Sequence, residues 1–429
     1  MKNKIIKWVK KLIPKNLKKN AFLRKGLAYL SSGLFGFPSR HLTLIGVTGT
    51  TGKTTTTFMI RSILEEAGIK TGLIGTAGYY FGSEVVYNQN EGPGTTPDPF
   101  TLHHILRKMI AQNVKVVILE VSSFGLMYYR TYGLNFQSAV LTNIAFNHHV
   151  TLHGSMDNYV KEKLKLFQYL SPTSLAVLPS ESEYFDVFKK ATKAKIVTYG
   201  VNPQNDFWAE DSKIHCKDQI FDLKLKILGN FNILNALAAI AAVSFLKIEP
   251  STIKQGLEKL ITIPGRLELL PSRAPFQIII DKANTPLAFE KLIEYLKNDY
   301  RKQSHKIIAV YGTFHESPKE ERDMLAKIAT QFFDLIIFTE DDPANEKREK
   351  SLDDFLSFVH QNNVDPNKYL TILNREEAIK AAINHAQAND LIVILGRGNE
   401  QFMLYQDKKI PFDDREVTKN ILKELNYLL

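Results

Sequence analysis

The sequence predicts an α/β fold with two domains, each built on a mainly parallel sheet covered by helices. Short apolar runs of strand length alternate with longer amphipathic stretches along most of the chain, which is typical of parallel sheets. A loop rich in glycine and threonine directly follows the first apolar run and opens a helical stretch. Because 429 residues exceed one ordinary domain, two or three domains of about 100 to 200 residues are expected.

The first alternating series begins at His41. It comprises an apolar run at 42–47, the Gly/Thr loop, a helical stretch to about Ala67, and apolar runs at 114–119 and 139–144. Residues 82–98, rich in Gly, Pro, Thr and Asn, are expected to form a surface loop.

A second series of apolar runs follows at 276–280, 307–310, 335–338 and 391–395. The break near Pro264 and Gly265 separates the two series. We therefore expect a basic N-terminal segment at 1–40, a central domain at 41–264 and a C-terminal domain at 265–429.

The distribution of charge and the cysteine content exclude several classes of protein. The net charge of +10 comes from residues 1–40, which hold eleven Lys or Arg and no acid, whereas the rest holds 44 basic and 45 acidic residues. The body is thus near neutral, and we expect no nucleic-acid partner. One cysteine, Cys216, excludes a disulfide framework and a cysteine-based zinc site. Without a spanning run of about 18 apolar residues or a signal peptide, the expected compartment is the cytoplasm.

The segment Lys2 to Lys25 combines basic and apolar residues. Its apolar members recur at near-helical spacing: Ile5, Ile6, Trp8, Val9, Leu12 and Ile13. This pattern suits an interfacial helix on anionic lipid at the inner face of the membrane. The alternative is a solubilising tail, because Pro14 would interrupt a long helix.

The strongest motif is a phosphate loop between a strand and a helix. Its glycines let backbone N–H groups surround phosphate oxygens, Lys53 can reach the terminal phosphates of ATP, and Thr54 can hold Mg²⁺. Since Val47 stands where the strict pattern has glycine, the loop is a variant, and the alternative is a plain turn. The residues predicted to bind ATP here are Gly49, Thr50, Thr51, Gly52, Lys53, Thr54 and Thr55.

Glu120 ends a buried-looking strand, at the sheet edge where ligands of such folds bind. A carboxylate there suits Mg²⁺, and the alternative is a solvated loop residue. His148, His149 and His153 follow another strand end, Thr142–Asn143. They lack the helical spacing of a zinc pair, so they are interpreted as loop histidines, one of which can touch Mg²⁺.

Lys163 lies in a predicted amphipathic helix in which Tyr159, Leu166 and Phe167 face inward. From this pattern alone, Lys163 belongs to a solvated basic face.

Together these motifs resemble the Mur ligases of peptidoglycan synthesis, most closely the UDP-N-acetylmuramoyl-tripeptide synthetases. The resemblance runs from Leu44 to the C-terminus. Besides the phosphate loop, it rests on residues 95–98 (TTPD), 120–123 (EVSS), 142–143 with His148, 153–154, Tyr159 with Lys163 and Phe167, 229–236 (GNFNILNA), 265–268 (GRLE) and 412–416 (FDDRE).

The resemblance implies a central ATPase and a Rossmann-like C-terminal domain that holds an amino acid, without the family's N-terminal UDP-binding domain. It assigns catalysis to Lys53, Lys163 and His148, and a second Mg²⁺ to Glu120 and His148. A carbamylated Lys163 would position the metal, which replaces the solvated-face interpretation. Positions near the nucleotide are Asn235, Arg266 and Asp281. Substrate-binding positions are Thr95, Thr96, Ser122, Ser123, Arg130, Asp341, Asp342 and Glu400.

Departures from the family pattern concern substrate choice. The Asp-Asn-Pro-Arg signature of diaminopimelate-adding members is Asp341-Asp342-Pro343-Ala344 here. Alanine cannot pair with the extra carboxylate of diaminopimelate, so the resemblance implies a lysine-like amino acid. The alternative is that this loop has drifted without a change of substrate. Further departures place Phe124, Asn147, Asn284, Arg397 and Asn399 where the family has other residues.

The implied reaction activates a muropeptide carboxylate with ATP as an acyl phosphate, which an amine attacks to give an amide, ADP and phosphate. The donor carries UDP or is a truncated or lipid-linked analogue. One alternative is a related ligase of the folylpolyglutamate type; an amidated-lipid-II ligase with a four-cysteine zinc ribbon is excluded by the single cysteine. The other is an inactive nucleotide-binding scaffold.

Overall fold

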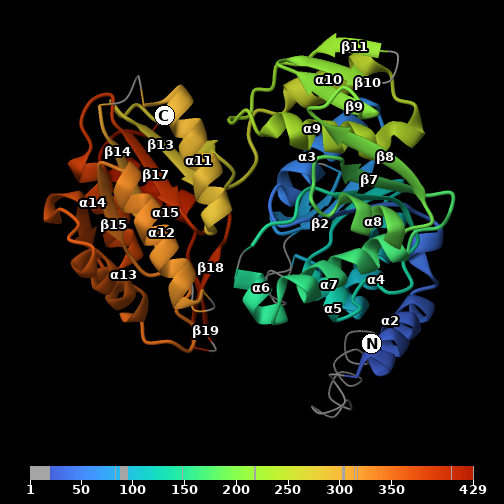
Figure 1. The fold of residues 1–429 in the computed structure, drawn as a ribbon, viewed down its shortest axis with the longest axis horizontal. Coiled ribbons are helices and arrows are strands. Elements are labelled where there is room, and N and C mark those ends of the chain that lie inside the picture. The colour runs from blue at the N-terminus through green and yellow to red at the C-terminus, as the bar shows by residue number, and fades with distance from the viewer. Residues whose placement is uncertain are drawn as a thin grey trace. The chain divides into compact units, whose positions relative to one another are not determined.

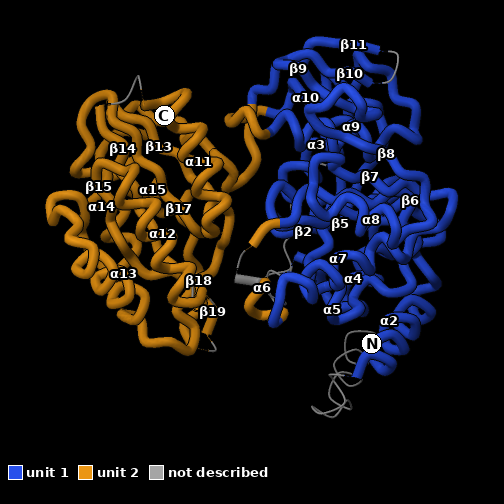
Figure 2. The backbone as a smooth tube through the Cα atoms, in the orientation of Figure 1, with its two compact units in different colours: residues 1–144, 154–226, 232–260 blue, residues 145–153, 227–231, 261–429 orange. Residues whose placement is uncertain are grey.

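The computed structural model describes residues 20–82, 84–86, 95–146, 148–216, 219–301, 305–313, 315, 317–406 and 408–428. Most of the basic segment 2–25 and Asn147 lie outside them, and of His148 the backbone alone is described. The chain forms two compact units, shown in Figure 2. Unit 1 comprises Met1–Ile144, Gly154–Lys226 and Asn232–Leu260, and unit 2 comprises Ala145–His153, Ile227–Phe231 and Ile261–Leu429.

In the described part of unit 1, one sheet has the strand order β11-β10-β9-β8-β7-β6-β1-β5-β2-β3-β4. Its central strands are parallel, with β1 between β5 and β6. The bounds are β1 Thr43–Thr48, β2 Thr71–Gly75, β3 Gly78–Phe81, β4 Glu84–Val86, β5 Val116–Glu120, β6 Phe136–Leu141, β7 Leu175–Pro179, β8 Lys195–Gly200, β9 Phe207–Glu210, β10 Lys213–Cys216 and β11 Gln219–Asp222.

Helices cover both faces of this sheet (Figure 1). On one face α4, α7 and α8 contribute Leu106, Phe167 and Phe188 to the core, while α3, α9 and α10 pack against one another on the other face. The bounds are α2 Ala21–Leu34, α3 Lys53–Glu66, α4 Pro99–Ala111, α5 Ser123–Met127, α7 Met156–Gln168, α8 Phe185–Ala191, α9 Asn232–Val243 and α10 Pro250–Lys259, with 3₁₀ turns at Pro38–Arg40 and Ser244–Leu246.

Unit 2 has a sheet in the order β12-β13-β17-β14-β15-β16, parallel except for β12, and a separate β18-β19 hairpin. Alternate residues of its strands point to two apolar layers: Ile279 packs in the layer of α11 and α12, and Ile278 in that of α14 and α15. The bounds are β12 Glu268–Leu269, β13 Gln277–Asp281, β14 Ile307–Tyr311, β15 Leu335–Phe338, β16 Tyr369–Thr371, β17 Leu391–Leu395, β18 Phe402–Tyr405, β19 Lys408–Pro411, α6 His148–His153, α11 Pro286–Asp299, α12 Lys319–Phe332, α13 Lys350–Gln361, α14 Arg375–His385 and α15 Asp414–Glu424, with a 3₁₀ turn at Pro366–Lys368.

The expected fold class is confirmed, and two of the predicted strands, 335–338 and 391–395, have the bounds expected. The prediction of a loop throughout 82–98 is wrong, because Glu84–Val86 forms β4. This strand contains β-branched valines and pairs antiparallel with β3, following a turn at Gly82. The strand was missed because the surrounding residues are rich in Gly, Pro, Thr and Asn. Among the described helices, none combines the length and the apolar character needed to cross a bilayer.

Candidate active site

The phosphate loop in unit 1 requires its two glycines. Gly49 has φ 150° and Gly52, which caps α3, has φ 80°. A Cβ at Gly49 would lie 1.9 Å from Thr142 Oγ1, and one at Gly52 would lie 2.5 Å from Asn235 Oδ1. Thr54 and Thr55 are buried in the first turn of α3. The loop thus runs from the end of β1 to a helix N-terminus, which favours bound phosphate.

Thr142 and Asn143, at the end of β6, hold this loop in place. Thr50 N donates to Asn143 O (2.9 Å) and Thr51 N donates to Asn143 Oδ1 (3.0 Å). Thr142 Oγ1 donates to Thr51 O at 2.6 Å. Local sequence patterns do not predict this role, because it depends on β6 lying beside β1.

Two lysines converge on one backbone carbonyl. Lys53 Nζ donates to Gly49 O and Thr50 O, both at 2.9 Å, and Lys163 Nζ donates to Gly49 O at 2.9 Å. Burial, and secondly the charge of Lys53, hold the pKa of Lys163 well below its usual 10.5. Both effects favour the neutral form of the Lys163 amine over its charged form.

The solvated-face interpretation of Lys163 is wrong, since its side chain is 1% exposed. Tyr159, Leu166 and Phe167 are buried as predicted. Lys163 lies one helical turn after Tyr159 and shares its face, with Nζ 4.6 Å from the centre of that ring. The Tyr159 hydroxyl in turn lies 3.1 Å from Thr50 Oγ1, so α7 contacts the loop at two points.

Glu120 lies at the end of β5, in register with Val47 of β1. It is fully buried, so the alternative of a solvated loop residue is wrong. Thr76 Oγ1 donates to Glu120 Oε2 at 2.9 Å, while Oε1 accepts no hydrogen bond from the described residues. A buried carboxylate oxygen without a donor beside a phosphate loop fits a magnesium ligand.

The predicted substrate residues of unit 1 form one network around Thr96. Thr96 Oγ1 donates to Glu120 O and accepts from Ser122 N, both at 2.9 Å, and Arg130 Nη1 donates to Thr96 O at 2.6 Å. Thr95 Oγ1 lies 2.9 Å from Thr76 Oγ1, and Ser123 is buried at the start of α5. Burial lowers the pKa of Arg130 despite the charge of Asp98, in a region of low polarity.

The three positions expected near the nucleotide fall in different units. Asn235 belongs to unit 1, where it accepts a hydrogen bond from Thr56 Oγ1 (3.4 Å). Arg266 and Asp281 belong to unit 2. Asp281 accepts from the backbone N–H groups of Leu267 and Ala283, both at 2.7 Å, and loss of solvent raises its pKa against the charge of Arg266. Asp281 therefore fixes the chain around Arg266.

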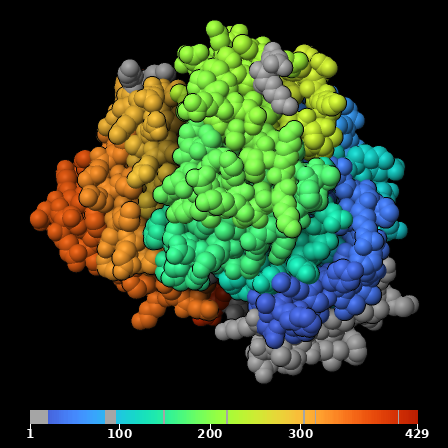
Figure 3. All heavy atoms as spheres, turned by 45° about the vertical axis from the view of Figure 1, so that its right-hand side comes forward, coloured from blue at the N-terminus to red at the C-terminus, as the bar shows by residue number. Residues whose placement is uncertain are grey.

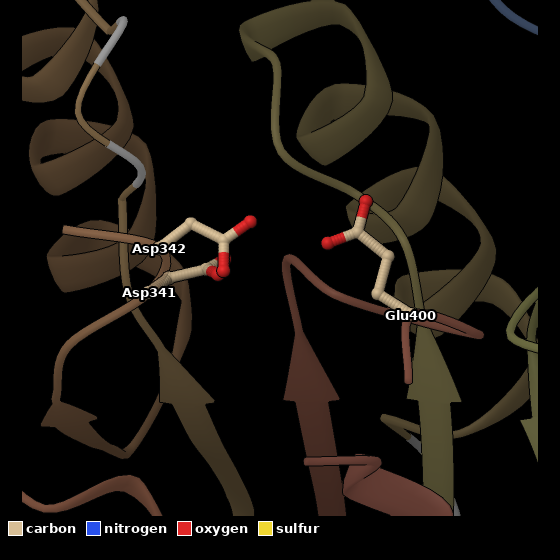
Figure 4. Close-up of side chains that lie close together, drawn as sticks. All are labelled: Asp341, Asp342 and Glu400. Carbon is tan, nitrogen blue, oxygen red and sulfur yellow. The ribbon is translucent and has the colours of Figure 1, made fainter. Parts of the chain in front are cut away.

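In unit 2, Asp341 and Asp342 follow β15, and their carboxylates lie close to that of Glu400, which follows β17 (Figure 4). Sequence reasoning missed the side chain that joins them. Arg397 is buried and donates to Asp341 Oδ1 (2.6 Å) and Asp342 Oδ1 (2.9 Å). Burial would lower the Arg397 pKa, but the surrounding carboxylates, Asp341 foremost, outweigh burial and raise it.

Comparisons with known proteins match both units. The model of the Mur ligase middle domain matches residues 47–243, and that of the Mur ligase glutamate ligase domain matches residues 265–398. A Clostridium tetani protein named UDP-N-acetylmuramoyl-L-alanyl-D-glutamate–2,6-diaminopimelate ligase is 36% identical over 94% of this chain and 82% of its own. The chain belongs to the Mur ligase family. It is therefore an ATP-dependent acid–amino-acid ligase, of the family that builds peptidoglycan precursors.

Two further likenesses concern this Mur ligase. UDP-N-acetylmuramyl-tripeptide synthetase 2 of Oceanobacillus iheyensis is 35% identical over 94% of this chain and 82% of its own. The folylpolyglutamate synthase of Mycobacterium tuberculosis, solved with ADP and AMPPCP, has a TM-score of 0.71 at 18% identity, covering 87% of this chain and 92% of that one. At that identity the likeness shows the shared fold.

Proposed function

We propose that this Mur ligase joins a lysine-like amino acid to the carboxylate of a muropeptide through an acyl phosphate, with ATP converted to ADP and phosphate. The donor is UDP-N-acetylmuramoyl-dipeptide or a truncated or lipid-linked analogue. The observation that supports this most strongly is the convergence of Lys53 and Lys163 on Gly49 O, next to the Thr96 network.

The phosphoryl step uses the loop and the helix that follows it. Backbone N–H groups at the start of α3 and the Lys53 ammonium attract the phosphate oxygens of ATP and offset charge on the transferring group. Glu120, Thr54 and His148 are the residues that would hold Mg²⁺, which would add positive charge at the phosphates when bound.

Lys163 supplies a further metal-positioning group if its amine is carbamylated. Its lowered pKa favours the neutral amine, whose lone pair can attack CO₂; the N–C bond forms and one proton leaves to solvent. The negative carbamate would attract the positive charge of Lys53, whereas a protonated Lys163 amine is repelled by it.

The donor carboxylate is expected to lie at the Thr96 network. Arg130 and the N-terminus of α5, where Ser122 and Ser123 stand, offer positive charge and hydrogen-bond donors there. Attack of the carboxylate on the γ-phosphorus releases ADP, and attack of the amine on the acyl phosphate releases phosphate. Fixed orientation of these groups is the main contribution of the protein.

The choice of a lysine-like amino acid rests on the charges around Asp342 and Glu400 in unit 2. Three of the cations near them are bound to carboxylates: Arg397 to Asp341 and Asp342, Lys282 to Glu400, and Arg348 to both oxygens of Glu340 at 2.7 Å. Ala344 is buried, with its N–H donating to Leu404 O (2.9 Å). This surrounding favours an amine over a second carboxylate, although the C. tetani relative is named a diaminopimelate ligase.

The test is phosphate release from ATP and Mg²⁺ with UDP-N-acetylmuramoyl-dipeptide, comparing lysine, diaminopimelate and no amino acid. We expect release that needs both substrates and favours lysine. Preference for diaminopimelate would overturn the amino-acid assignment alone. Tight ATP binding without amino-acid-dependent release, with either a UDP-linked or a lipid-linked donor, would favour the scaffold alternative.

Two variants test whether the phosphate release depends on the phosphate loop. Lys53→Ala is expected to lower phosphate release by about 10²- to 10³-fold, the cost of losing one preorganised charge at a developing anion. Lys165→Ala is the matched control, because Lys165 lies on the same helix as Lys163 but pairs with Glu162, and its loss is expected to leave release unchanged. Equal loss in both variants would contradict the role of Lys53.

We also propose that the enzyme lies in the cytoplasm and attaches to the inner face of the membrane through residues 2–25. Most of that segment lies outside the described residues, so its support is the sequence: eight Lys and no acid in residues 1–19.

A further inference from the structure

Helix α2 carries an apolar face on its outer side. Phe22, Tyr29, Leu30 and Leu34 are 87%, 56%, 51% and 53% exposed. We call these four residues the outer face of α2. They are four of the fifteen large apolar side chains that are exposed in the described part of the chain, and one helix of 14 residues holds them all. Such clustering marks an interaction surface, unlike single exposed apolar residues.

The inner side of α2 explains why the apolar residues point outward. Ser31 Oγ donates to Pro99 O of α4 at 3.0 Å, and Ala28, Ser31 and Ser32 are buried. The two cations of the helix also lie inward: Arg24 Cζ is 4.2 Å from the Tyr128 ring, and Lys25 Nζ is 5.1 Å from the Tyr129 ring. These contacts fix the rotation of α2 on unit 1.

Charge identifies the chemistry of the partner. Residues 1–40 hold eleven Lys or Arg and no Asp or Glu, whereas the rest of the chain has 44 basic and 45 acidic residues. An apolar helix face that follows a lysine-rich stretch in the sequence complements a surface that is anionic outside and apolar beneath, and a bilayer of acidic phospholipid has that structure. A second copy of the same basic segment would be repelled.

We propose that the outer face of α2 docks on an anionic phospholipid bilayer, with the lysines of residues 1–19 attracted to its headgroups. Aromatic Phe22 and Tyr29 would lie at headgroup level, and Leu30 and Leu34 would enter the acyl boundary. Figure 3 shows the N-terminal part of unit 1 in blue at the molecular surface.

Docking through α2 would also place the donor side of the site near the membrane. The Tyr128 ring that faces Arg24 also faces Arg130, whose Cζ is 5.5 Å from its centre, and Arg130 donates to Thr96 O. Two contacts thus connect α2 to the Thr96 network. A lipid-linked muropeptide is the donor that this placement would serve; this last step rests on the proposed function, whereas the docking surface does not.

The test is sedimentation of the full chain with vesicles of phosphatidylglycerol or phosphatidylcholine. We expect binding to phosphatidylglycerol vesicles that weakens with salt and is at least ten-fold weaker with phosphatidylcholine. The double variant Phe22→Glu, Leu30→Glu is expected to lose at least ten-fold in affinity, and Leu34→Glu alone a smaller part. Ile220→Glu is the control, since Ile220 is exposed on β11 and carries no part of this surface.

Several outcomes would overturn the docking surface. They are absence of vesicle binding by the full chain, equal binding of the double variant and the wild type, and equal binding to both lipids. Self-association that the double variant abolishes would instead identify a second copy as the partner. Unchanged thermal midpoints and unchanged ATP-dependent phosphate release with the soluble donor would show that the variants fold, and separate this result from the fate of the proposed function.

Discussion

At the residue scale, burial of Lys163 lowers the pKa of its amine and so makes the neutral, nucleophilic form more accessible. Lys161, Glu162 and Lys165 surround it in sequence, and each of them is more exposed than Lys163. Lys163 alone shares the face of Tyr159 and reaches Gly49 O, 114 residues away in the chain. Burial, and secondly the charge of Lys53, lower its pKa, and the local sequence pattern reveals neither cause.

The buried amine predicts a specific dependence of stability on pH. Because the pKa of Lys163 is lower in the folded state than its usual 10.5, the unfolded state binds more protons between the two values. Stability of the CO₂-free, metal-free protein should therefore rise with pH through this window and be lowest below it. Lys163→Met removes the pH-dependent contribution of this amine to the free energy of unfolding. Below the window the variant should be more stable than the wild type by on the order of 1 to 3 kcal/mol.

Urea unfolding of wild type and Lys163→Met at several pH values measures this difference. Lys165→Met, on the same helix but at a lysine paired with Glu162, should follow the wild-type curve. Parallel curves for wild type and Lys163→Met would contradict a lowered pKa.

At the scale of elements, α3 and α10 pack so closely that Gly256 has no room for a side chain. A Cβ there would lie 2.8 Å from Ile63 Cα and 2.9 Å from Ser62 O, both backbone atoms of α3. Gly256→Ala should destabilise unit 1 by about 1 to 3 kcal/mol, because the helices must separate.

Gly26→Ala is the opposite case, since nothing lies within 4 Å of a Cβ at Gly26 in α2. It should stabilise by about 0.5 to 1 kcal/mol through helix propensity. Thermal midpoints of the two variants should therefore move in opposite directions, and a shift in the same direction would contradict the packing argument.

Helices α14 and α15 are joined by one buried and one exposed ion pair. Arg375 and Asp414, both fully buried, form two hydrogen bonds of 2.7 Å, whereas Lys380 and Glu424 are exposed and 3.8 Å apart. Arg375→Met leaves a buried carboxylate without its partner and should cost about 3 to 5 kcal/mol.

Lys380→Met is the matched control, with an expected change below about 1 kcal/mol. Denaturant midpoints compare the two, and Arg375→Met combined with Asp414→Leu should recover most of the loss. A small effect of Arg375→Met would mean that Asp414 is hydrated in the variant.

At the scale of the whole molecule, the two units have separate apolar cores. We expect two transitions in urea, since each core can unfold on its own. A non-hydrolysable ATP analogue at 100-fold its Kd should stabilise the transition of unit 1 by about 2.7 kcal/mol. Arg375→Met should lower the other midpoint, and one cooperative transition that both changes shift would contradict this assignment.

The alternating fold and the phosphate loop could be predicted because both are local patterns. Contacts between residues far apart in the sequence could not be predicted. Thr51 N donates a hydrogen bond to Asn143 Oδ1, 92 residues away, and Arg397 donates to Asp341, 56 residues away. Short polar strands such as β11 (Gln219–Asp222) also gave no apolar signal. Positions of Glu120 and Thr96 follow from strand order, which the sequence indicates only through family resemblance.

The Arg375–Asp414 pair also bears on the order in which the two units fold during synthesis. During synthesis, Arg375 emerges from the ribosome 39 residues before its partner carboxylate. Until Asp414 emerges, closing the sheet of unit 2 over this side of α14 would bury the guanidinium without its carboxylate partner. We therefore expect the nascent C-terminal unit to close only after α15 is synthesised, when the loop, α7 and β6 of the ligase centre are already complete, so that the N-terminal unit folds first.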